Sequence, residues 1–381
     1  MSSISVNTIT DASGGSTTSI NGFTPSVSNM AGRNRIINGD MRIDQRNAGA
    51  AVAVTSSANA YNIDRWEHFK QSTNGAFTVQ RSTLAPVGFT NSLSISVTSA
   101  FASSESGSAV NSLVQFIEGY NVADLKWGTA DAKPITVSFW VRSSVTGNYT
   151  FTVGNVNYDR QYATTYSINS ANTWEKKSIT ILGDTTGTWN NDNTVGIRIW
   201  FDLGTGTGYP SSPADSWTTS QVFHLSGTVQ LMATSGATFY ITGVQLEEGS
   251  VATPFCPAGG GSYGAELALC QRYYWQSHEG TKGSPAGAVI ATTGVQGQTS
   301  TGMVNGCVGI LPVEMRSNGT ASIYDWNNTA GVLMRFDPNS ANHTGQSGYA
   351  AVRNKRWLFL NSNSGLGASQ VGAHIEIEAE L

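Results

Sequence analysis

Residues 34–46 read NRIINGDMRIDQR, a stretch in which apolar side chains are set among side chains that form hydrogen bonds. Asn38-Gly39 at its centre predicts a β-hairpin turn, because Asn and Gly best tolerate the positive φ of a tight turn. After the turn, Met41 and Ile43 alternate with charged residues, which predicts a strand with one apolar and one charged face. Opposite charges on such a face usually satisfy each other. We therefore interpret the stretch as a fold signature and not as a catalytic cluster.

The composition predicts a folded protein that is rich in strands. The length of 381 residues is typical of two domains, or of a large β-sandwich with a smaller unit. Only 12% of the residues are charged, while 10 Trp, 13 Tyr and 14 Phe can fill cores, so the chain does not have the composition of a disordered protein. The 42 Gly indicate frequent turns, and few Lys and Glu beside many Thr, Val and Ile favour strands over helices.

The charge and hydropathy patterns exclude several classes of partner. A net charge of −4, from 21 basic and 25 acidic residues without a basic run, predicts no nucleic-acid partner and no anionic membrane partner. No stretch approaches about 18 apolar residues, so we expect no membrane insertion. The opening MSSISVNTIT lacks the basic and apolar regions of a secretory signal, so we expect no signal peptide.

Residues 1–32 are small and polar, with only scattered Ile, Val and Phe, and cannot bury a core of their own. We interpret them as an arm that is either disordered or ordered against a partner. From residue 33 to 257, short strand patterns alternate with clusters of Gly, Asn, Asp and Pro, which predicts an antiparallel, jelly-roll-like β-sandwich. The clearest strand patterns lie at 93–97, 135–141, 149–153, 177–181, 195–201, 228–231 and 238–246.

A boundary and a helix follow the predicted sandwich. The sequence PFCPAGGGS at 254–262 marks the boundary by its composition. Residues 263–275 predict the best short helix in the chain, with Leu269 and Tyr273 at i and i+4, and we expect its apolar face to dock on a neighbouring sheet.

Residues 258–381 are expected to form a small C-terminal β-domain that begins with this helix. Its strand patterns lie at 309–315, 321–326, 356–360 and 374–381. In the last pattern Ile375 and Ile377 alternate with Glu376 and Glu378, which predicts a half-exposed strand with one acidic face.

Several separated motifs resemble tail-fibre and other receptor-binding proteins of bacteriophages. In those proteins an NGDF-like, a WQRG-like and a YTADRW-like motif open a β-sandwich of carbohydrate-binding type, and this chain has NGD at 38–40, DQR at 44–46 and NIDRW at 62–66. The similarity continues through the sandwich and into the C-terminal domain. Its further motifs are FWVRS at 139–143, WEK at 174–176, WFDLG at 200–204, VQLEEGSVATPF at 244–255, ELALCQRYY at 266–274 and LPVEMRS at 311–317.

The resemblance implies a virion fibre protein. Its motifs also have a physical role of their own. Gln45-Arg46 and Asp64-Arg65 can form a charge-assisted network that pins the start of the sandwich. The resemblance further implies a homotrimer, attachment of residues 1–32 to other tail or capsid proteins, and adhesion to a host surface glycan or receptor. We accordingly expect the protein in the virion, as a tail fibre, after assembly in the host cytoplasm.

Aromatic residues in turn-rich contexts are the candidates for sugar contacts, because a ring stacks on the apolar face of a pyranose. Amides and carboxylates around the ring then bind the sugar hydroxyls. The candidates are Trp189, Tyr209, Trp217, Tyr158 and Tyr162. Each of these residues has an equally simple role as an anchor for its loop.

The sequence gives little support for a metal ion or other cofactor. A structural Ca²⁺ is the one cofactor we consider, with Asp184 and the run Asn190–Asn193 as oxygen donors, but EF-hand or repeat spacing is missing and we predict none. Cys256, Cys270 and Cys307 are odd in number and form no CxxC pair, which predicts buried thiols and neither a zinc site nor a disulfide framework.

We predict no enzyme and no catalytic residue. The five His form no HExxH motif, and neither a GxSxG motif nor a phosphate-binding glycine loop occurs. Glu247 and Glu248 are adjacent in a predicted strand and therefore point to opposite faces. Two alternatives stay open. Facing carboxylates in one cleft would favour a glycan-degrading tailspike enzyme, and buried aromatic residues without an exposed ring would favour a purely structural virion component such as a head fibre.

Overall fold

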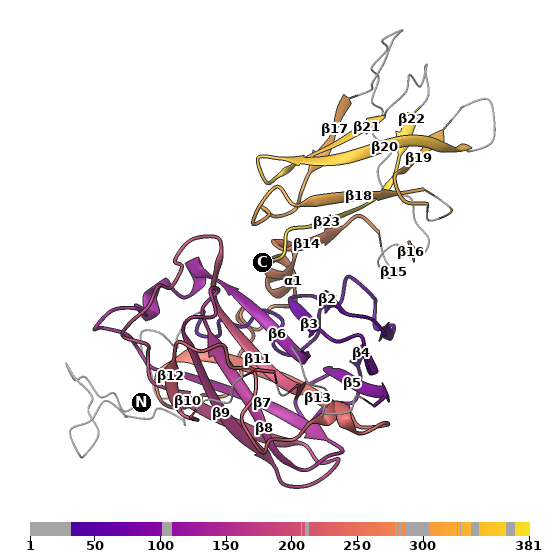
Figure 1. Cartoon of the computed structure of the whole chain (residues 1–381). Coiled ribbons are helices and arrows are strands. Elements are labelled where there is room, and N and C mark those ends of the chain that lie inside the picture. Colours follow the sequence, from indigo (N-terminus) through magenta and orange to yellow (C-terminus); the bar gives the residue numbers. More distant parts are fainter. Residues whose placement is uncertain are drawn as a thin grey trace, which may run out of the picture.

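The computed structural model describes residues 32–100, 109–206, 208–209, 213–278, 280–281, 284–285, 305–325, 327, 329–336, 343–362 and 370–381. It is almost entirely β, with 44% strand and 6% helix. This confirms the predicted fold class, an all-β chain with a sandwich, a smaller β-domain and one short α-helix between them (Figure 1). No helix in the described part of the chain is long and apolar enough to cross a membrane.

Two antiparallel sheets form the sandwich. The six-stranded sheet has the order β1 (Val52–Val54), β4 (Ala76–Ser82), β5 (Ser92–Ser99), β13 (Thr238–Glu248), β7 (Ile135–Ser143) and β10 (Glu175–Ile181). The seven-stranded sheet has the order β12 (Ser216–Thr218), β9 (Gln161–Ile168), β8 (Gly147–Gly154), β11 (Val195–Thr205), β6 (Val110–Glu118), β3 (Trp66–Lys70) and β2 (Ala58–Ile63).

The core lies between the two sheets and follows from the alternation of side chains. In β11, Ile199 and Phe201 point into the core, while Trp200 between them points to the outer face of its sheet. The ring of Phe139 in β7 lies 5.1 Å from that of Phe201, edge to face. Burial of each such large side chain contributes about 1.5–3 kcal/mol, so the facing aromatic residues hold the two sheets together.

Six of the seven strand patterns predicted in the sandwich overlap observed strands. The pattern at 228–231 is wrong, because Thr228 and Val229 lie in a loop whose Val229 N–H bonds to Asn148 O at 2.7 Å, and a 3₁₀ turn, η3 (Leu231–Ala233), follows. The strands that the sequence did not reveal include β3 and β6, which are buried on both faces and so lack alternation.

The opening stretch forms a turn, as predicted, but the predicted hairpin strand after it is wrong. Asn38 and Met41 both have φ of 58°, and no strand includes residues 41–44. The Asn38 side chain takes the place of a strand partner: its Nδ2 donates to Ile43 O at 2.7 Å, and its Oδ1 accepts from Ile43 N at 3.0 Å. Gly39 lies against β13, where Val244 N donates to Gly39 O at 2.9 Å.

The helix α1 (Tyr263–Gln271) is shorter than predicted. It begins at Ser262, whose hydroxyl accepts from Ala265 N, and the next strand, β14 (Tyr274–Gln276), follows almost at once. The expected helical pairing of Leu269 with Tyr273 is therefore wrong, since Tyr273 lies beyond the helix. The helix and the residues directly after it dock on the opening stretch. Cys270 of the helix and Tyr273 beyond it pack against Ile37 and Ile43.

The C-terminal domain consists of two packed sheets and a short β15 (Gly280–Thr281) and β16 (Ser284–Pro285) pair. The three-stranded sheet has the order β14, β23 (His374–Glu378) and β18 (Thr320–Tyr324). The larger sheet has the order β17 (Asn305–Ile310), β21 (Trp357–Ser362), β20 (His343–Arg353), β19 (Val332–Phe336) and β22 (Gln370–Gly372). The predicted strand at 309–315 is wrong beyond Ile310, because residues 311–317 form an irregular segment that contains Pro312.

The predicted acidic face of the last strand is mostly covered, although 38% of the Glu378 side chain is exposed. Strand β23 lies in the middle of its sheet, Glu376 is buried, and the Glu380 side chain is 5% exposed. The Arg46 guanidinium, which is fully buried, binds Glu378 Oε1 at 2.8 Å and Glu380 Oε1 at 2.9 Å. Arg65 binds the other oxygen of Glu380. The charged residues of the opening motifs thus join the sandwich to the last residues of the chain.

Two tyrosine rings complete this junction. The Arg46 guanidinium lies 3.9 Å from the ring centroid of Tyr274, and that of Arg65 lies 3.6 Å from the ring centroid of Tyr273. Burial alone would lower the pKa of Arg46, but the carboxylates around it, Glu380 first, raise the pKa above its ordinary value. Both guanidinium groups therefore stay charged and paired.

The predicted network between Gln45 and Asp64 is also present. Gln45 donates to Asp64 through its backbone N–H at 2.7 Å and through Nε2 at 2.5 Å. Burial raises the pKa of Asp64 to about 6, against the opposing charge of Arg46. These bonds fix the two opening motifs to each other, and Gln45 Nε2 also donates to Tyr274 O of β14 at 3.1 Å.

Replacing Arg65 by Met is expected to lower the free energy of unfolding by about 3–5 kcal/mol, because it leaves the buried Glu380 carboxylate with one cation fewer. Urea denaturation measures the change. The control is Arg35→Met, which removes a more exposed pair with Asp124 and should cost about 0–1 kcal/mol. Equal losses in the two variants would show that the buried junction contributes no more than a surface ion pair.

Replacing Gly39 by Ala is expected to destabilise the fold strongly, since the new Cβ would lie 2.1 Å from Val244 O, a backbone atom of β13. The matched control is Gly264→Ala in α1, where no atom lies within 4 Å of the new Cβ. That change should stabilise by about 0.5–1 kcal/mol through helix propensity. Thermal unfolding of both variants checks the prediction, and a Tm of Gly39→Ala equal to that of the parent protein would contradict it.

Candidate functional site

The structure divides the five predicted sugar-contacting residues between two clusters. Trp189, Trp217 and Tyr162 lie together at one end of the sandwich, and the ring centroids of Trp189 and Trp217 are 5.6 Å apart. A fourth ring that the sequence did not suggest, Trp127, lies 4.7 Å from Trp189 and 5.3 Å from Trp217, centroid to centroid. These contacts are edge to face.

The tryptophans of this first cluster also anchor their loops. Trp189 Nε1 donates to Thr186 O at 3.2 Å, Trp217 Nε1 to Leu182 O at 3.0 Å, and Trp127 Nε1 to Lys133 O at 2.8 Å. Trp189 and Trp217 are half-buried, and the cavity beside Trp127 and Trp189 measures about 70 Å³. This space is too small for a sugar ring, so only the outer faces of the rings are accessible to a ligand.

The oxygen donors considered for Ca²⁺ have other partners. Both oxygens of Asp184 bind Arg160, at 2.6 Å each, and Oδ1 also accepts from Thr186. Asp192 Oδ1 accepts from Thr194 N at 2.9 Å and from the Thr194 hydroxyl at 2.6 Å. Among the described residues no group of three or more His, Cys, Asp or Glu could hold a metal ion.

Tyr158 and Tyr209 belong to the second cluster, on the outer face of the seven-stranded sheet. Tyr209 lies 4.6 Å from Phe223, which in turn lies 4.8 Å from Trp200 of β11, centroid to centroid. Tyr158 covers the buried guanidinium of Arg198 at 3.1 Å from its ring centroid. The segment that contains Phe223 therefore covers this face of the sheet.

Buried polar groups lie beneath this cover. Burial lowers the pKa of Arg198 to about 10, and it raises the pKa of Asp202 to about 7 against the hydrogen bond from the Thr205 hydroxyl. Among the described residues, Arg198 Nη1 and Nη2, Trp200 Nε1 and Asp202 Oδ2 have no hydrogen-bond partner. Tyr158 and Tyr209 thus take part in closing a polar layer.

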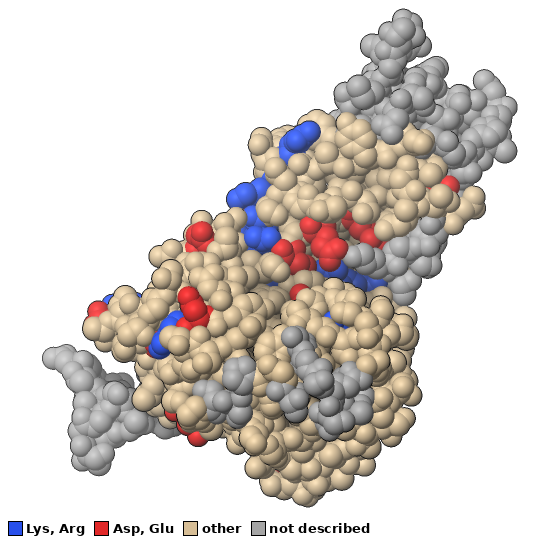
Figure 2. All heavy atoms as spheres, in the orientation of Figure 1, with Lys and Arg blue, Asp and Glu red and all other residues tan. Residues whose placement is uncertain are grey.

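A cleft that the sequence did not predict lies where the sandwich meets the C-terminal domain. It measures about 640 Å³, and Figure 2 shows acidic side chains gathered in the hollow between the two domains. Strands β2 and β3 and the turn after the opening stretch supply one wall, and the last residues of the chain supply the other. The lining residues are Asn47, Val52, Asn59, Ala60, Tyr61, Asn62, Glu67, Glu378 and Glu380.

The local structure fixes each polar group of this junction cleft. Asn47 Nδ2 donates to Asn62 O at 2.6 Å, and Asn59 Oδ1 accepts from Lys70 N at 3.2 Å. Tyr61 OH donates to Leu381 O at 3.2 Å, which ties the wall of the sandwich to the end of the chain. The cleft therefore presents amides, carboxylates and a half-buried tyrosine on a rigid frame.

The carboxylates of the junction cleft lie in different surroundings. Burial, and then the charge of Glu380, raise the pKa of Glu67 to about 7. Glu380 is held between Arg46 and Arg65 by ion pairs. Near neutral pH the cleft thus contains a carboxyl group, that of Glu67, which titrates.

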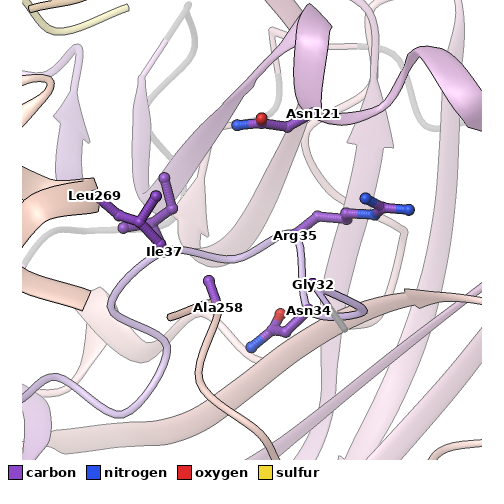
Figure 3. Close-up of a pocket in the computed structure, with 7 residues that line it drawn as sticks. All are labelled: Gly32, Asn34, Arg35, Ile37, Asn121, Ala258 and Leu269. Carbon is purple, nitrogen blue, oxygen red and sulfur yellow. The ribbon is translucent and has the colours of Figure 1, made fainter. Parts of the chain in front are cut away.

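A smaller pocket of about 210 Å³ lies on the other side of the opening stretch (Figure 3). Figure 3 shows the apolar side chains of Ile37 and Leu269 together at one end, while Asn121 and Arg35 lie apart from them. Arg35 is already paired with Asp124 at 2.6 Å. Fewer polar groups converge here than in the junction cleft, so the latter is the stronger candidate for a ligand site.

No family model and no curated protein matches the chain. Solved structures resemble it over about half of its length. A putative sugar binding protein from Bacteroides thetaiotaomicron has a TM-score of 0.32 and 13% identity and covers 57% of this chain and 100% of its own. TmCBM61 in complex with β-1,4-galactotriose has a TM-score of 0.28 and 9% identity, over 57% of this chain and 99% of that one.

The enzymatically active domain of tailspike protein 4 from bacteriophage CBA120 has a TM-score of 0.28 and 12% identity. The match covers 56% of this chain and 21% of the tailspike chain. Structural similarity at these TM-scores does not indicate the function of this chain.

Replacing Glu67 by Gln is expected to reduce the loss of stability between pH 5 and pH 8. The pKa of Glu67 is raised from 4.5 to about 7 in the folded protein, so this carboxyl favours folding at low pH and loses that contribution as the pH rises through about 7. Between pH 5 and pH 8 the contribution of Glu67 to the free energy of unfolding is expected to fall by an amount on the order of 3 kcal/mol. Thermal unfolding at both pH values measures it, with Glu314→Gln, an exposed position, as the control. An unchanged pH dependence in Glu67→Gln would contradict the prediction.

Proposed function

We propose that this chain is a virion fibre protein of a bacteriophage, of the tail-fibre type, that adheres non-covalently to glycan on the host cell surface. The observation that carries the glycan part of the proposal is the junction cleft. Its amide and carboxylate oxygens accept hydrogen bonds from sugar hydroxyls, and its amide N–H groups donate to them. Its volume and open shape suit a short oligosaccharide.

The assembly of the particle forms a second part of the proposal. The chain forms a homotrimer, and residues 1–32 attach it to other tail or capsid proteins. Several copies of a weak site then act together, because linked sites raise the avidity without any new contact. This part rests on the resemblance of the sequence motifs.

The aromatic residues predicted from the sequence are secondary candidates for contact with the glycan. Trp189, Trp217 and Tyr162 present ring faces at the end of the sandwich, and Tyr158 and Tyr209 lie at the edge of the covered polar layer. Their packing roles are established by the contacts above, while their contact with a sugar stays a prediction.

Glycan cleavage in the junction cleft is the second candidate function. One observation favours it: Glu67, with its pKa raised to about 7, shares the cleft with Glu380, which is paired with two arginines. A proton donor beside a carboxylate is the arrangement that glycoside hydrolysis requires. The burial of Glu380 in its ion pairs disfavours it as a nucleophile, so we place adhesion first. A purely structural virion component remains the third candidate.

Asn59→Ala is expected to weaken glycan binding about tenfold, since it removes an exposed amide of the junction cleft. The measurement is surface plasmon resonance of the purified chain over immobilised bacterial lipopolysaccharides and capsular polysaccharides. The control is Asn169→Ala, an exposed Asn outside the cleft whose side chain also makes one hydrogen bond.

The same panel separates the candidate functions. Release of reducing ends that Glu67→Gln abolishes would move the conclusion to cleavage. Failure of the wild-type protein to bind any member of the panel, or equal binding by Asn59→Ala and wild type, would overturn the assignment of the junction cleft to glycan adhesion.

A further inference from the structure

Strands β21 and β20 of the C-terminal domain have one packed face and one open face, and Ile310 at the end of β17 pairs with Trp357 beside them. Val352, Leu358 and Leu360 point into the core of the domain. The residues between them point outward, because side chains alternate along a strand. On this outward face Ile310 is 57% exposed, Tyr349 45% and Trp357 44%.

The aromatic residues of the outward face form a row. Trp357 and Phe359 lie two residues apart on β21, which places them about 7 Å from each other along the strand. Tyr349 continues the row diagonally on β20, since it pairs with Asn361, the next outward position after Phe359. This row, with Tyr349 and Trp357 exposed and Phe359 half-buried, differs from the two clusters of the sandwich, whose rings cover one another.

A cluster of positive charge lies beside this row. Arg353 pairs in register with Trp357, and the turn between them contains Lys355 and Arg356. Asn354 and Lys355 have φ of 50° and 60°, which closes the turn tightly and keeps the three cations together. Within the described part of the chain none of the three takes part in an ion pair, although the net charge of the protein is −4.

We propose that this outward face, formed by Tyr349, Trp357 and Phe359 with Arg353 and Arg356, is a second glycan-binding surface, specific for an anionic polysaccharide. The proposal rests on the proposed adhesion function and gives it a second substrate class. Sugar rings stack on the aromatic row, and the arginines bind the carboxylate, phosphate or sulfate groups of the polymer. The junction cleft, with its own acidic residues, repels the same polymer.

Charge and composition favour an anionic polysaccharide at this face over a second copy of the chain, a nucleic acid or another protein. Two copies of the chain that met through this face in a two-fold contact would bring their arginine clusters together, and the like charges oppose such a contact. The cluster has three cations, fewer than a nucleic-acid backbone usually engages. Among the described residues of the face, Ile310 is the one exposed large aliphatic side chain, which is unlike the apolar centre of a protein interface.

The test is binding of the full chain to alginate, heparin and polyglycerol phosphate, with neutral dextran as the reference, by surface plasmon resonance. We expect at least one anionic polymer to bind and dextran not to bind at this face. We also expect the affinity to fall at least tenfold in Trp357→Ala and in the double variant Arg353→Gln with Arg356→Gln. Raising NaCl from 50 to 300 mM should weaken the wild type far more than the double variant.

Controls separate this face from other surfaces. Tyr120→Ala removes another exposed ring, and Lys126→Gln removes another exposed charge, and neither should change binding. Light scattering follows the mass of each variant. A change of mass in place of a change in binding would identify the face as an interface between copies and overturn the proposal.

The failure of this proposal is distinguishable from the failure of the adhesion function. Binding of polysaccharides that Asn59→Ala abolishes, and that the Trp357 and arginine variants leave intact, would overturn the second surface and preserve the junction cleft. Absence of binding to all three anionic polymers would likewise overturn the second surface. Absence of binding to these polymers and to the lipopolysaccharide and capsule panel would overturn both.

Discussion

The carboxylate of Glu380 is the point on which the arrangement of the two domains depends. One of its oxygens binds Arg46 and the other binds Arg65, so two arginines that are 19 positions apart in the sandwich meet one residue at the end of the chain. Each guanidinium also lies on a tyrosine ring that follows α1. Because both arginines are buried, removal of any member leaves a charge without its partner, and the domains separate only at the cost of exposing all of them.

The junction cleft is a consequence of this contact. Its two walls come from parts of the chain more than 300 positions apart, and the bond from Tyr61 to Leu381 O closes the same seam. The cleft therefore exists only while the domains are docked, and Glu67 owes part of its raised pKa to Glu380 across the seam. Protonation in the cleft and the docking of the domains are in this way linked through one pair of carboxylates.

The sequence predicts those parts of the fold that local patterns determine. Alternation reveals β7 and β8, and the composition of residues 254–262 indicates the end of the sandwich. It fails at β3 and β6, because strands that are covered on both faces do not alternate, and at residues 41–44, where the Asn38 side chain replaces a strand partner. The acidic face of β23 shows the same limit: alternating Glu and Ile predicts a half-exposed strand, but Glu376 is buried and distant arginines bind Glu378 and Glu380. The junction cleft could not be predicted at all, since its walls meet only in the folded chain.

The distribution of the aromatic residues bears on where a ligand can bind. A ring that binds sugar needs a free face, and a ring in a turn-rich segment is equally suited to hold its loop. Trp127, Trp189 and Trp217 bond through their indole N–H groups to loop carbonyls and cover one another, so much of their surface is already used for packing. Exposed rings lie instead on the five-stranded sheet of the C-terminal domain. Converging polar groups lie at the domain junction. The candidate surfaces for recognition thus lie away from the sandwich core that the opening motifs specify.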